Sequence, residues 1–360
     1  MTSEPLNRRR AVSRLTSWLA ASPLSTGQQL LGEPPGRIAP AHELANTLEF
    51  EAMAERQLGS TTFRLIAGSD RRPFDRLTLR PRLMVRTENM DLTTELFGQK
   101  MFAPILVGPV AEQKRFHPQG ELATVEGASA AQAVMVVSSR SSWPLEEIAA
   151  HGKATLWYQV YPEPDVTALQ TRIAKAVDLG CKAVCITVGT EYQPGDPRTS
   201  AGPPAPVQVA SLDWSVIDRL RQGVRVPVLL KGVMTPGEAR TCVAKGIAGI
   251  IVSDHGGPAV GGLASPLETL PSVAEAVGGK VPILIDGGFR RGTDILKGLA
   301  LGARAVLIAR PPMWGLAAYG ADGVSTLLKM LQTELARNMA MCGKLTPSSA
   351  DPKLVAIHRR

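Results

Sequence analysis

Eight short apolar runs rich in Val and Ile recur between residues 103 and 311 of this 360-residue chain. The first run is APILVGPV from Ala103, and the last is AVLIARP from Ala305. The six runs between them begin at Ala133, Thr155, Lys182, Val226, Ala248 and Val281. Continuous runs without polar alternation are typical of parallel strands that are buried on both faces. The sequence therefore predicts eight buried parallel strands.

Helical patterns separate these runs, and their ends carry start and stop signals. The predicted helices span residues 121–132, 166–179, 214–221, 236–245, 267–277 and 293–301. Thr235 and Ser265 each place a capping hydroxyl before a proline at the first helical position. Gly180, Gly246 and Gly302 stand where C-terminal caps belong. This alternation favours an α/β fold of the (β/α)8 TIM barrel type, with an N-terminal helical extension, over a doubly wound open sheet.

Composition excludes several classes of protein. The formal net charge is +8, which favours anionic ligands. Aromatic residues make up only 4% and are not interleaved with the basic residues, which argues against a nucleic-acid stacking platform. No apolar run reaches the roughly eighteen residues that a membrane-spanning helix requires. The four cysteines form no CxxC pair, so we expect neither a disulfide nor a bound metal.

The first 45 residues differ from the rest and are predicted to form a basic, flexible tail ahead of one barrel domain at 46–360. Arginines cluster at positions 8–10, and a Pro- and Gly-rich stretch follows at 32–40. The twin arginines resemble a weak export signal, but Arg14 interrupts the short apolar stretch behind them. A cytoplasmic location is therefore favoured, with a periplasmic location as the alternative.

Polar residues follow nearly every predicted strand at its carboxyl end, where TIM barrels hold their active sites. The set consists of Pro109, Ser138, Tyr161, Thr187, Lys231, His255, Asp286, Gly288 and Arg310. Taken singly, Ser138 and Thr187 are explained as well by helix capping or mutual pairing as by contact with a ligand. The convergence of the whole set favours an active site.

Lys231 and His255 end otherwise apolar strands and are the main candidates for catalysis. The lysine is either half of a structural salt bridge or a positive charge that faces an anionic cofactor or intermediate. His255 is a candidate general base, and the two glycines after it permit close approach of a flat ligand.

The last two strands lead into DGGFRRG from Asp286 and ARP from Ala309. Loops after the seventh and eighth strands of a TIM barrel commonly bind phosphate through glycine N–H groups and a helix N-terminus. Arg290 and Arg310 add positive charge at the same place. These residues predict a ligand that carries a phosphate.

Taken in order, LKGVMTPGEA, IIVSDHGG and IDGGFRRGTDILKGLALGARAVLIARP resemble the FMN-dependent α-hydroxy-acid oxidases and dehydrogenases, the class of glycolate oxidase, lactate oxidase and mandelate dehydrogenase. The resemblance extends over residues 48 to 345. It implies an FMN flavoprotein that oxidises a lactate-like 2-hydroxy acid to the 2-oxo acid. It also implies a homotetramer or larger assembly, whereas the sequence does not identify the electron acceptor.

The resemblance assigns roles to the residues at the strand ends. His255 would take a proton from the 2-hydroxy acid, and Tyr161 would hydrogen-bond the substrate oxygen. Lys231 would face flavin N1 and stabilise the reduced anionic flavin. The other FMN contacts would be Pro109, Val110 and Ala111 along the ring, Ser138, Gln159 and Thr187 at its polar edge, Asp286, Gly288, Arg290 and Arg310 at the phosphate, and Ser253 and Ala309 nearby.

Two departures from the family pattern bear on the substrate. Pro258 stands where the family has the arginine that clamps the substrate carboxylate, and proline offers neither charge nor N–H. Gly189 replaces the aspartate that supports the protonated histidine, so His255 should be a poorer base. Arg64 or Arg140 could replace the clamp, because a guanidinium can bind a carboxylate bidentately; the alternative is that both are surface arginines.

Two other functions stay open. A flavoprotein that oxidises a larger or uncharged alcohol would not need the missing arginine. An FMN-binding homologue with weakened catalysis would explain both losses, although the retained Lys231, His255 and Tyr161 argue against it.

Overall fold

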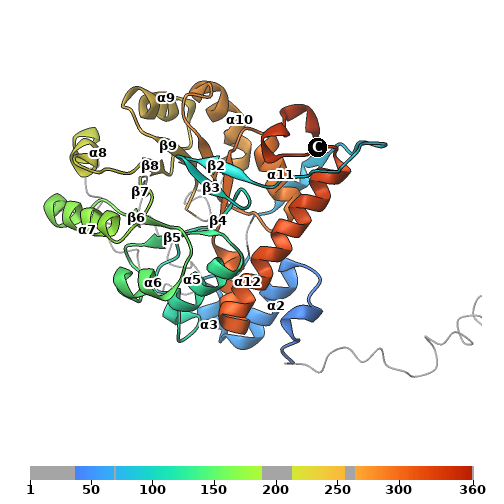
Figure 1. Ribbon diagram of the computed structural model, residues 1–360, viewed down its shortest axis with the longest axis horizontal. Coiled ribbons are helices and arrows are strands. Elements are labelled where there is room, and N and C mark those ends of the chain that lie inside the picture. The colour runs from blue at the N-terminus through green and yellow to red at the C-terminus, as the bar shows by residue number, and fades with distance from the viewer. Residues whose placement is uncertain (1–36, 69, 189–212, 256–263, 359–360) are drawn as a thin grey trace, which may run out of the picture. The chain divides into compact units, whose positions relative to one another are not determined.

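The computed structural model describes residues 37–68, 70–188, 213–255 and 264–358 (Figure 1). The chain divides into two compact units, Met1–Ile38 and Ala39–Arg360. Residues 1–36, which make up nearly all of the first unit and most of the predicted basic tail, lie outside the described residues, whereas residues 37–45 of that tail are described. The predicted position of the boundary between tail and barrel stays a prediction.

Eight parallel strands close into a barrel in the order β10-β11-β4-β5-β6-β7-β8-β9. They are β4 (Ile105–Val107), β5 (Val134–Ser138), β6 (Leu156–Val160), β7 (Val184–Thr187), β8 (Val228–Lys231), β9 (Gly249–Val252), β10 (Ile283–Ile285) and β11 (Ala305–Ile308). Each strand lies within one of the eight apolar runs, and every strand residue is buried. The predicted TIM barrel is confirmed.

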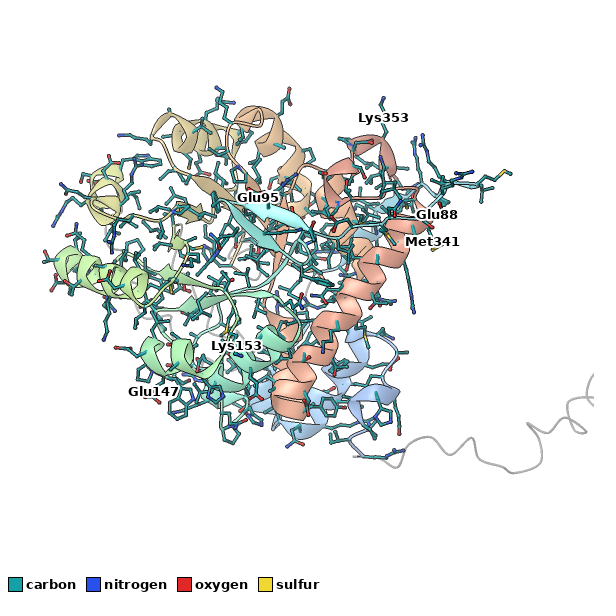
Figure 2. The ribbon with its side chains drawn as sticks, in the orientation of Figure 1. Glu88, Glu95, Glu147, Lys153, Met341 and Lys353 are labelled. Atoms are coloured by element: carbon teal, nitrogen blue, oxygen red, sulfur yellow. The ribbon has the colours of Figure 1, made fainter. Side chains whose placement is uncertain are left out.

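The strands are connected by helices that cover the outside of the barrel (Figure 1). These helices are α5 (Glu121–Ala130), α6 (Leu145–His151), α7 (Val166–Asp178), α8 (Trp214–Arg221), α9 (Pro236–Ala244), α10 (Pro266–Val277) and α11 (Gly292–Ala300). All six predicted helices are present, and Thr235 and Ser265 each form a capping box. The sequence missed α6, which is short. The exposed Glu147 and Lys153 show how the charged side chains lie on the outer surface (Figure 2).

Elements from both ends of the chain pack beside the barrel. The N-terminal elements are η1 (Ala41–Glu43), α2 (Thr47–Gln57), α3 (Ser60–Phe63) and α4 (Arg72–Asp75), and the C-terminal ones are α12 (Arg310–Met341), η3 (Pro347–Ser349) and η4 (Pro352–Leu354). The predicted N-terminal helical extension is thus present. Helix α12 bends at Gly320 (φ 61°) and packs on α2 and α5 (Figure 1). Strand β1 (Leu77–Leu79) pairs antiparallel with β12 (Val355–Ile357), which joins the two ends.

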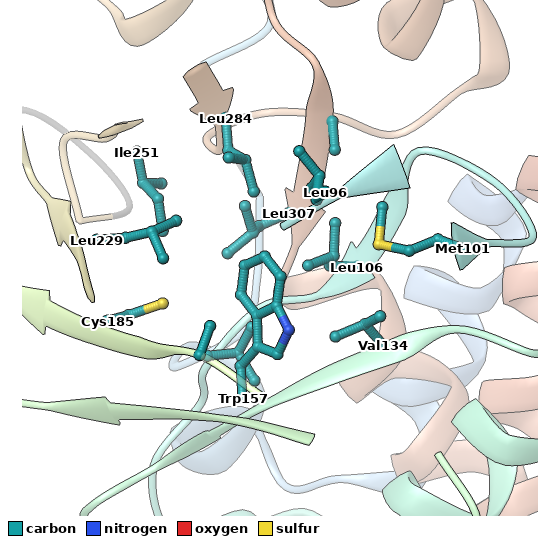
Figure 3. Close-up of a cluster of buried hydrophobic side chains, with 13 residues drawn as sticks. Leu96, Met101, Leu106, Val134, Trp157, Cys185, Leu229, Ile251, Leu284 and Leu307 are labelled. Atoms are coloured by element: carbon teal, nitrogen blue, oxygen red, sulfur yellow. The ribbon is translucent and has the colours of Figure 1, made fainter. Parts of the chain in front are cut away.

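A hairpin of β2 (Thr94–Leu96) and β3 (Gln99–Met101) closes the amino-terminal end of the barrel. Its turn, Phe97–Gly98, has positive φ at both positions, as tight hairpin turns require. Leu96 and Met101 pack with the inward side chains of the strands, including Trp157, in one buried cluster (Figure 3). With this end filled by side chains, the opposite end is left for chemistry.

Within the described part of the chain, no helix is long and apolar enough to cross a membrane. The same residues contain no group of three or more His, Cys, Asp and Glu side chains that could hold a metal ion. The four cysteines are buried and free.

Candidate active site

Lys231 ends β8, and its ammonium group is held by two neighbours from the next two strands. Its Nζ donates to Ser253 Oγ at 2.7 Å and lies 2.8 Å from Asp286 Oδ2. The Lys231 and Asp286 side chains are only 7% and 14% exposed. The salt bridge considered from the sequence is therefore present. An ammonium group has three N–H donors, so these two contacts leave one for a ligand at the barrel mouth.

His255 stands next to this group, two residues beyond Ser253. Its backbone N–H donates to Ser253 Oγ at 3.2 Å, and its Nε2 lies 3.0 Å from the carbonyl oxygen of Val188. Because a carbonyl only accepts, this contact selects the tautomer with the proton on Nε2 and leaves Nδ1 as the basic nitrogen. Desolvation, and after it the charge of Lys231, lower the pKa of the imidazole. His255 is therefore neutral near pH 7 and can accept a proton.

Gly232 makes this arrangement of His255 possible, and the sequence reasoning missed it. Its φ is 114°, a value that favours glycine. A Cβ at this position would stand 2.1 Å from Val188 O and 2.9 Å from His255 Nε2. The only local signal was a glycine directly after the strand-ending lysine.

Several buried polar atoms at the ends of β5, β6 and β10 lack a partner. Gln159 Nε2 donates to Thr187 Oγ1 at 2.8 Å, but Gln159 Oε1 has no hydrogen-bond partner among the described residues. The same holds for Ser139 Oγ and Asp286 Oδ1. Leaving such an atom buried and unpaired costs about 1–3 kcal/mol. Their shared location indicates a ligand that carries N–H and O–H donors.

Arg140 and Tyr161 come together at the ends of β5 and β6. The Arg140 guanidinium lies over the Tyr161 ring, 4.2 Å from its centroid. The Arg140 backbone is held on both sides, because its N–H donates to Ser138 Oγ at 3.2 Å and its carbonyl accepts from Glu112 N at 3.0 Å. Arg140 and Arg64 are both exposed, but Arg64 stands at the end of α3, where its Nε donates to the Ser60 carbonyl of the same helix.

A buried carboxylate ties together the loops that follow β4 and β5. Glu121 Oε1 accepts from the backbone N–H groups of Gln113 at 3.1 Å and Ser142 at 2.9 Å. Gln113 in turn donates from Nε2 to the carbonyl of Val110 at 3.2 Å. These bonds fix the loops that carry Val110 and Arg140. The sequence offered no signal for this role, because an acidic residue in the first turn of a helix is ordinary.

Arg290 and Arg310 meet at the backbone carbonyl of Gly68. Arg290 Nη2 donates to it at 3.1 Å and Arg310 Nη1 at 2.5 Å. Arg290 is 3% exposed and also stacks on Trp314, 4.6 Å from the ring centroid. Burial, and after it the charge of Arg310, lower the pKa of Arg290 to about 9. Two neighbouring guanidinium groups of which one is deeply buried favour an anionic ligand.

The remaining predicted residues also border this end of the barrel. Pro109, Val110 and Ala111 are half-buried after β4, where the Gly108 N–H bonds the Ile308 carbonyl of β11 at 2.8 Å. Ala309 follows β11 directly. The carboxylate of Asp286, assigned to the phosphate by resemblance, lies against Lys231 instead. Gly189 and Pro258 lie outside the described residues.

A TIM barrel whose mouth gathers an ammonium, an imidazole and a pair of arginines after the last two strands defines an enzyme that binds a phosphate-bearing cofactor. The model of the FMN-dependent dehydrogenase family matches residues 59–202 and 196–357. The chain belongs to this family of FMN-dependent oxidoreductases that act on CH–OH groups. Its cofactor is therefore FMN.

Individual relatives agree with this assignment. Glycolate oxidase of Spinacia oleracea is 33% identical over 341 residues, which cover 84% of this chain and 92% of the relative. L-lactate oxidase of Nostoc sp. is 35% identical over 343 residues, with coverages of 83% and 94%. The crystal structure of mandelate oxidase has a TM-score of 0.82 and 32% identity, and covers 88% of this chain and 100% of its own.

The described residues fit FMN. The isoalloxazine carries an imide N–H that the unpaired Gln159 Oε1 can accept, and the ribityl hydroxyls are donors for Asp286 Oδ1. The phosphate complements Arg290 and Arg310. Gly288, two residues before Arg290, has a φ of 77°, a value that favours glycine.

Proposed function

We propose that this enzyme oxidises a lactate-like 2-hydroxy acid to the corresponding 2-oxo acid. The observation that carries the proposal is the hydroxyl of Ser253, which accepts hydrogen bonds from both Lys231 Nζ and the His255 backbone. A base is thereby fixed beside a cation at the mouth of a flavin-family barrel. Relatives named for glycolate and L-lactate oxidation support this choice of substrate class.

When bound, FMN supplies the acceptor for two electrons and one hydrogen of the substrate. The proposed roles of the protein groups follow from the contacts above. His255 receives the second hydrogen as a proton at Nδ1, while the Val188 carbonyl holds the opposite nitrogen. The free donor of Lys231 stabilises negative charge at the flavin edge.

Arg140 is the proposed clamp for the substrate carboxylate. It stacks on Tyr161, the predicted partner of the substrate oxygen, and Glu121 fixes the loop that carries it. Arg64, the other candidate, bonds its own helix instead. A guanidinium beside a phenol can bind a carboxylate while the phenol hydrogen-bonds the neighbouring oxygen.

The test is an anaerobic titration of the FMN-reconstituted protein, followed by visible absorbance. The panel contains L-2-hydroxy acids of increasing size and the uncharged amide of each acid. The proposal expects the acids to bleach the bound flavin and the amides to react at least tenfold more weakly, because one charge-assisted contact contributes about 1.5–3 kcal/mol.

Other outcomes select another function. Bleaching by amides or neutral alcohols alone would establish the larger or uncharged alcohol as substrate, in line with Pro258 at the usual clamp position. A flavin that binds and stays oxidised with the whole panel would establish a homologue with weakened catalysis.

On family resemblance we propose a homotetramer or larger, which sedimentation of the holoenzyme tests. We propose a cytoplasmic location because Arg14 interrupts the short apolar stretch after the twin arginines, with a periplasmic location as the alternative. Residues 1–36, which carry the twin-arginine-like motif, lie outside the described part of the chain.

A further inference from the structure

We propose that Arg71 is a positioning residue for the FMN phosphate, acting through the loop after β10. Arg71 lies just ahead of α4, in the N-terminal extension, more than 200 positions from that loop along the chain. The proposal requires only that the protein binds FMN. It does not depend on which substrate is oxidised.

Arg71 donates three hydrogen bonds, one to this loop and two to the first turn of α11, which follows it. Its Nη1 donates to the Gly288 carbonyl at 2.6 Å. Its Nη1 and Nη2 also donate to the two carboxylate oxygens of Asp294, at 2.7 and 3.0 Å. Asp294 is 1% exposed, and such bidentate pairs are strong and directional. We call the group Arg71, Gly288 and Asp294 the Arg71 clasp.

Asp294 connects Arg71 to the backbone of Arg290. Its Oδ2 accepts from the backbone N–H groups of Arg290 at 2.9 Å and Arg291 at 2.8 Å. One buried carboxylate therefore joins Arg71 to the backbone that carries the Arg290 guanidinium. Loss of Arg71 would remove the bidentate partner of a buried carboxylate that also bonds this backbone, which is costly.

The segment around Arg71 is also packed closely on Gly288. A Cβ on Gly288 would stand 2.7 Å from Phe74 Cε2 and 3.2 Å from the Asp70 carbonyl. Phe74 contacts Phe289 edge to face, with ring centroids 5.0 Å apart, and the Arg71 guanidinium lies 4.8 Å from the Phe74 centroid. The loop is thus held from its outer side by the N-terminal extension.

Charge adds to this geometry. Arg71 is among the groups whose positive charge lowers the pKa of Arg290, so the two guanidinium groups interact electrostatically. Together with Arg310 they create a positive potential at one site. A phosphate dianion offsets this repulsion, whereas a neutral ligand does not.

The test compares FMN with riboflavin, which lacks the phosphate. The apoprotein is titrated with each flavin, and dissociation constants are measured by quenching of flavin fluorescence. Arg71→Met should raise the dissociation constant of FMN at least tenfold and change that of riboflavin less than twofold. Arg72→Met is the matched control, because Arg72 pairs with Asp70 next door and its side chain is 82% exposed. It should leave both constants unchanged.

Two results would overturn the proposal. An unchanged affinity of Arg71→Met for FMN would show that Arg71 has no role at the phosphate. An equal loss of affinity for FMN and riboflavin would show that Arg71 only stabilises the fold. Arg71→Lys covers the case in which the methionine variant misfolds, because it keeps the charge and loses the bidentate pair. This variant should raise the dissociation constant of FMN by about threefold and leave that of riboflavin unchanged. An equal rise for riboflavin would again contradict the proposal.

Discussion

The ammonium of Lys231 lies 2.8 Å from the carboxylate of Asp286, although the two residues end β8 and follow β10, with β9 between them. Ser253, which follows β9, supplies the hydroxyl that completes the contact. Barrel closure brings the three strand ends to one point. The charge network at the flavin site is therefore built by the protein itself.

Asp286→Asn tests how much the Lys231–Asp286 ion pair contributes to the free energy of unfolding. The change leaves a buried ammonium without its counter-charge, so the free energy of unfolding of the apoprotein should fall by about 3–5 kcal/mol. Urea unfolding followed by circular dichroism measures it. Asp351→Asn is the control, because its partner is Lys344 and the carboxylate is 46% exposed; that loss should be about 0–1 kcal/mol. Equal losses would contradict the prediction.

Gly232→Ala should displace His255, the proposed base. The new Cβ would overlap Val188 O and crowd His255 Nε2, and a misplacement of about 1 Å can cost on the order of 100-fold in rate. Stopped-flow measurement of flavin reduction checks this. Gly180→Ala is the control that separates backbone strain from steric overlap of the new Cβ. Gly180 also has a positive φ, but it has open space around it. This control should cost about 1–2 kcal/mol of stability and leave the rate unchanged.

The acidic limb of the pH profile for flavin reduction should lie below pH 6.5. His255 must be neutral to accept a proton. Desolvation and the charge of Lys231 lower its pKa from 6.5 by more than the hydrogen bond to Val188 and the charges of Asp286 and Asp254 raise it. As the pH falls, activity is thus lost later than with an ordinary imidazole. Rapid-mixing rates between pH 4.5 and 8 measure the limb.

The control for this profile is a histidine remote from the barrel mouth. His151 ends α6 and lies beside Glu126 on the outer surface, so His151→Gln should leave the limb in place. A limb at or above pH 6.5 in the unmodified enzyme would count against a desolvated His255 as the base.

Arg140→Leu should weaken binding of the hydroxy acid without affecting FMN. Loss of a charge-assisted contact of about 2 kcal/mol corresponds to roughly 30-fold in the dissociation constant. Competition with a 2-oxo acid under anaerobic conditions gives this constant. Arg115→Leu is the control in the neighbouring loop, where Arg115 pairs with Glu112 and is 56% exposed. If both variants bind the acid equally well, Arg140 is not the clamp.

The elements predicted correctly are those whose signals are local. Strands buried on both faces appear in the sequence as unbroken apolar runs. Thr235 and Ser265 indicated helix starts as capping hydroxyls before a proline, and the structure shows a capping box at each. Helix α6 was missed because it has seven residues, a single buried side chain, Ile148, and no side-chain cap. Such a segment carries almost no periodicity.

The sequence indicated which residues stand at the mouth of the barrel, but not which of them contact one another. Strand ends located Lys231 and His255, since all eight carboxyl ends of a barrel meet at one face. The pattern left Arg64 and Arg140 equivalent, and the stacking of Arg140 on Tyr161 favours one of them. The sequence did not predict the roles of Gly232 and Glu121, because these roles depend on contacts with residues elsewhere in the sequence.

Local chemistry along the chain is sufficient to predict a TIM barrel, its active end and a phosphate-bearing ligand. The family resemblance adds that this ligand is FMN. Which side chains meet at that end was decided by folding, because closure of the barrel and docking of the N-terminal extension bring together residues far apart in sequence. Arg71 and Asp294 are separated by 223 positions, and Lys231 and Asp286 have strand β9 between them. Such contacts follow from packing geometry, which no local pattern encodes.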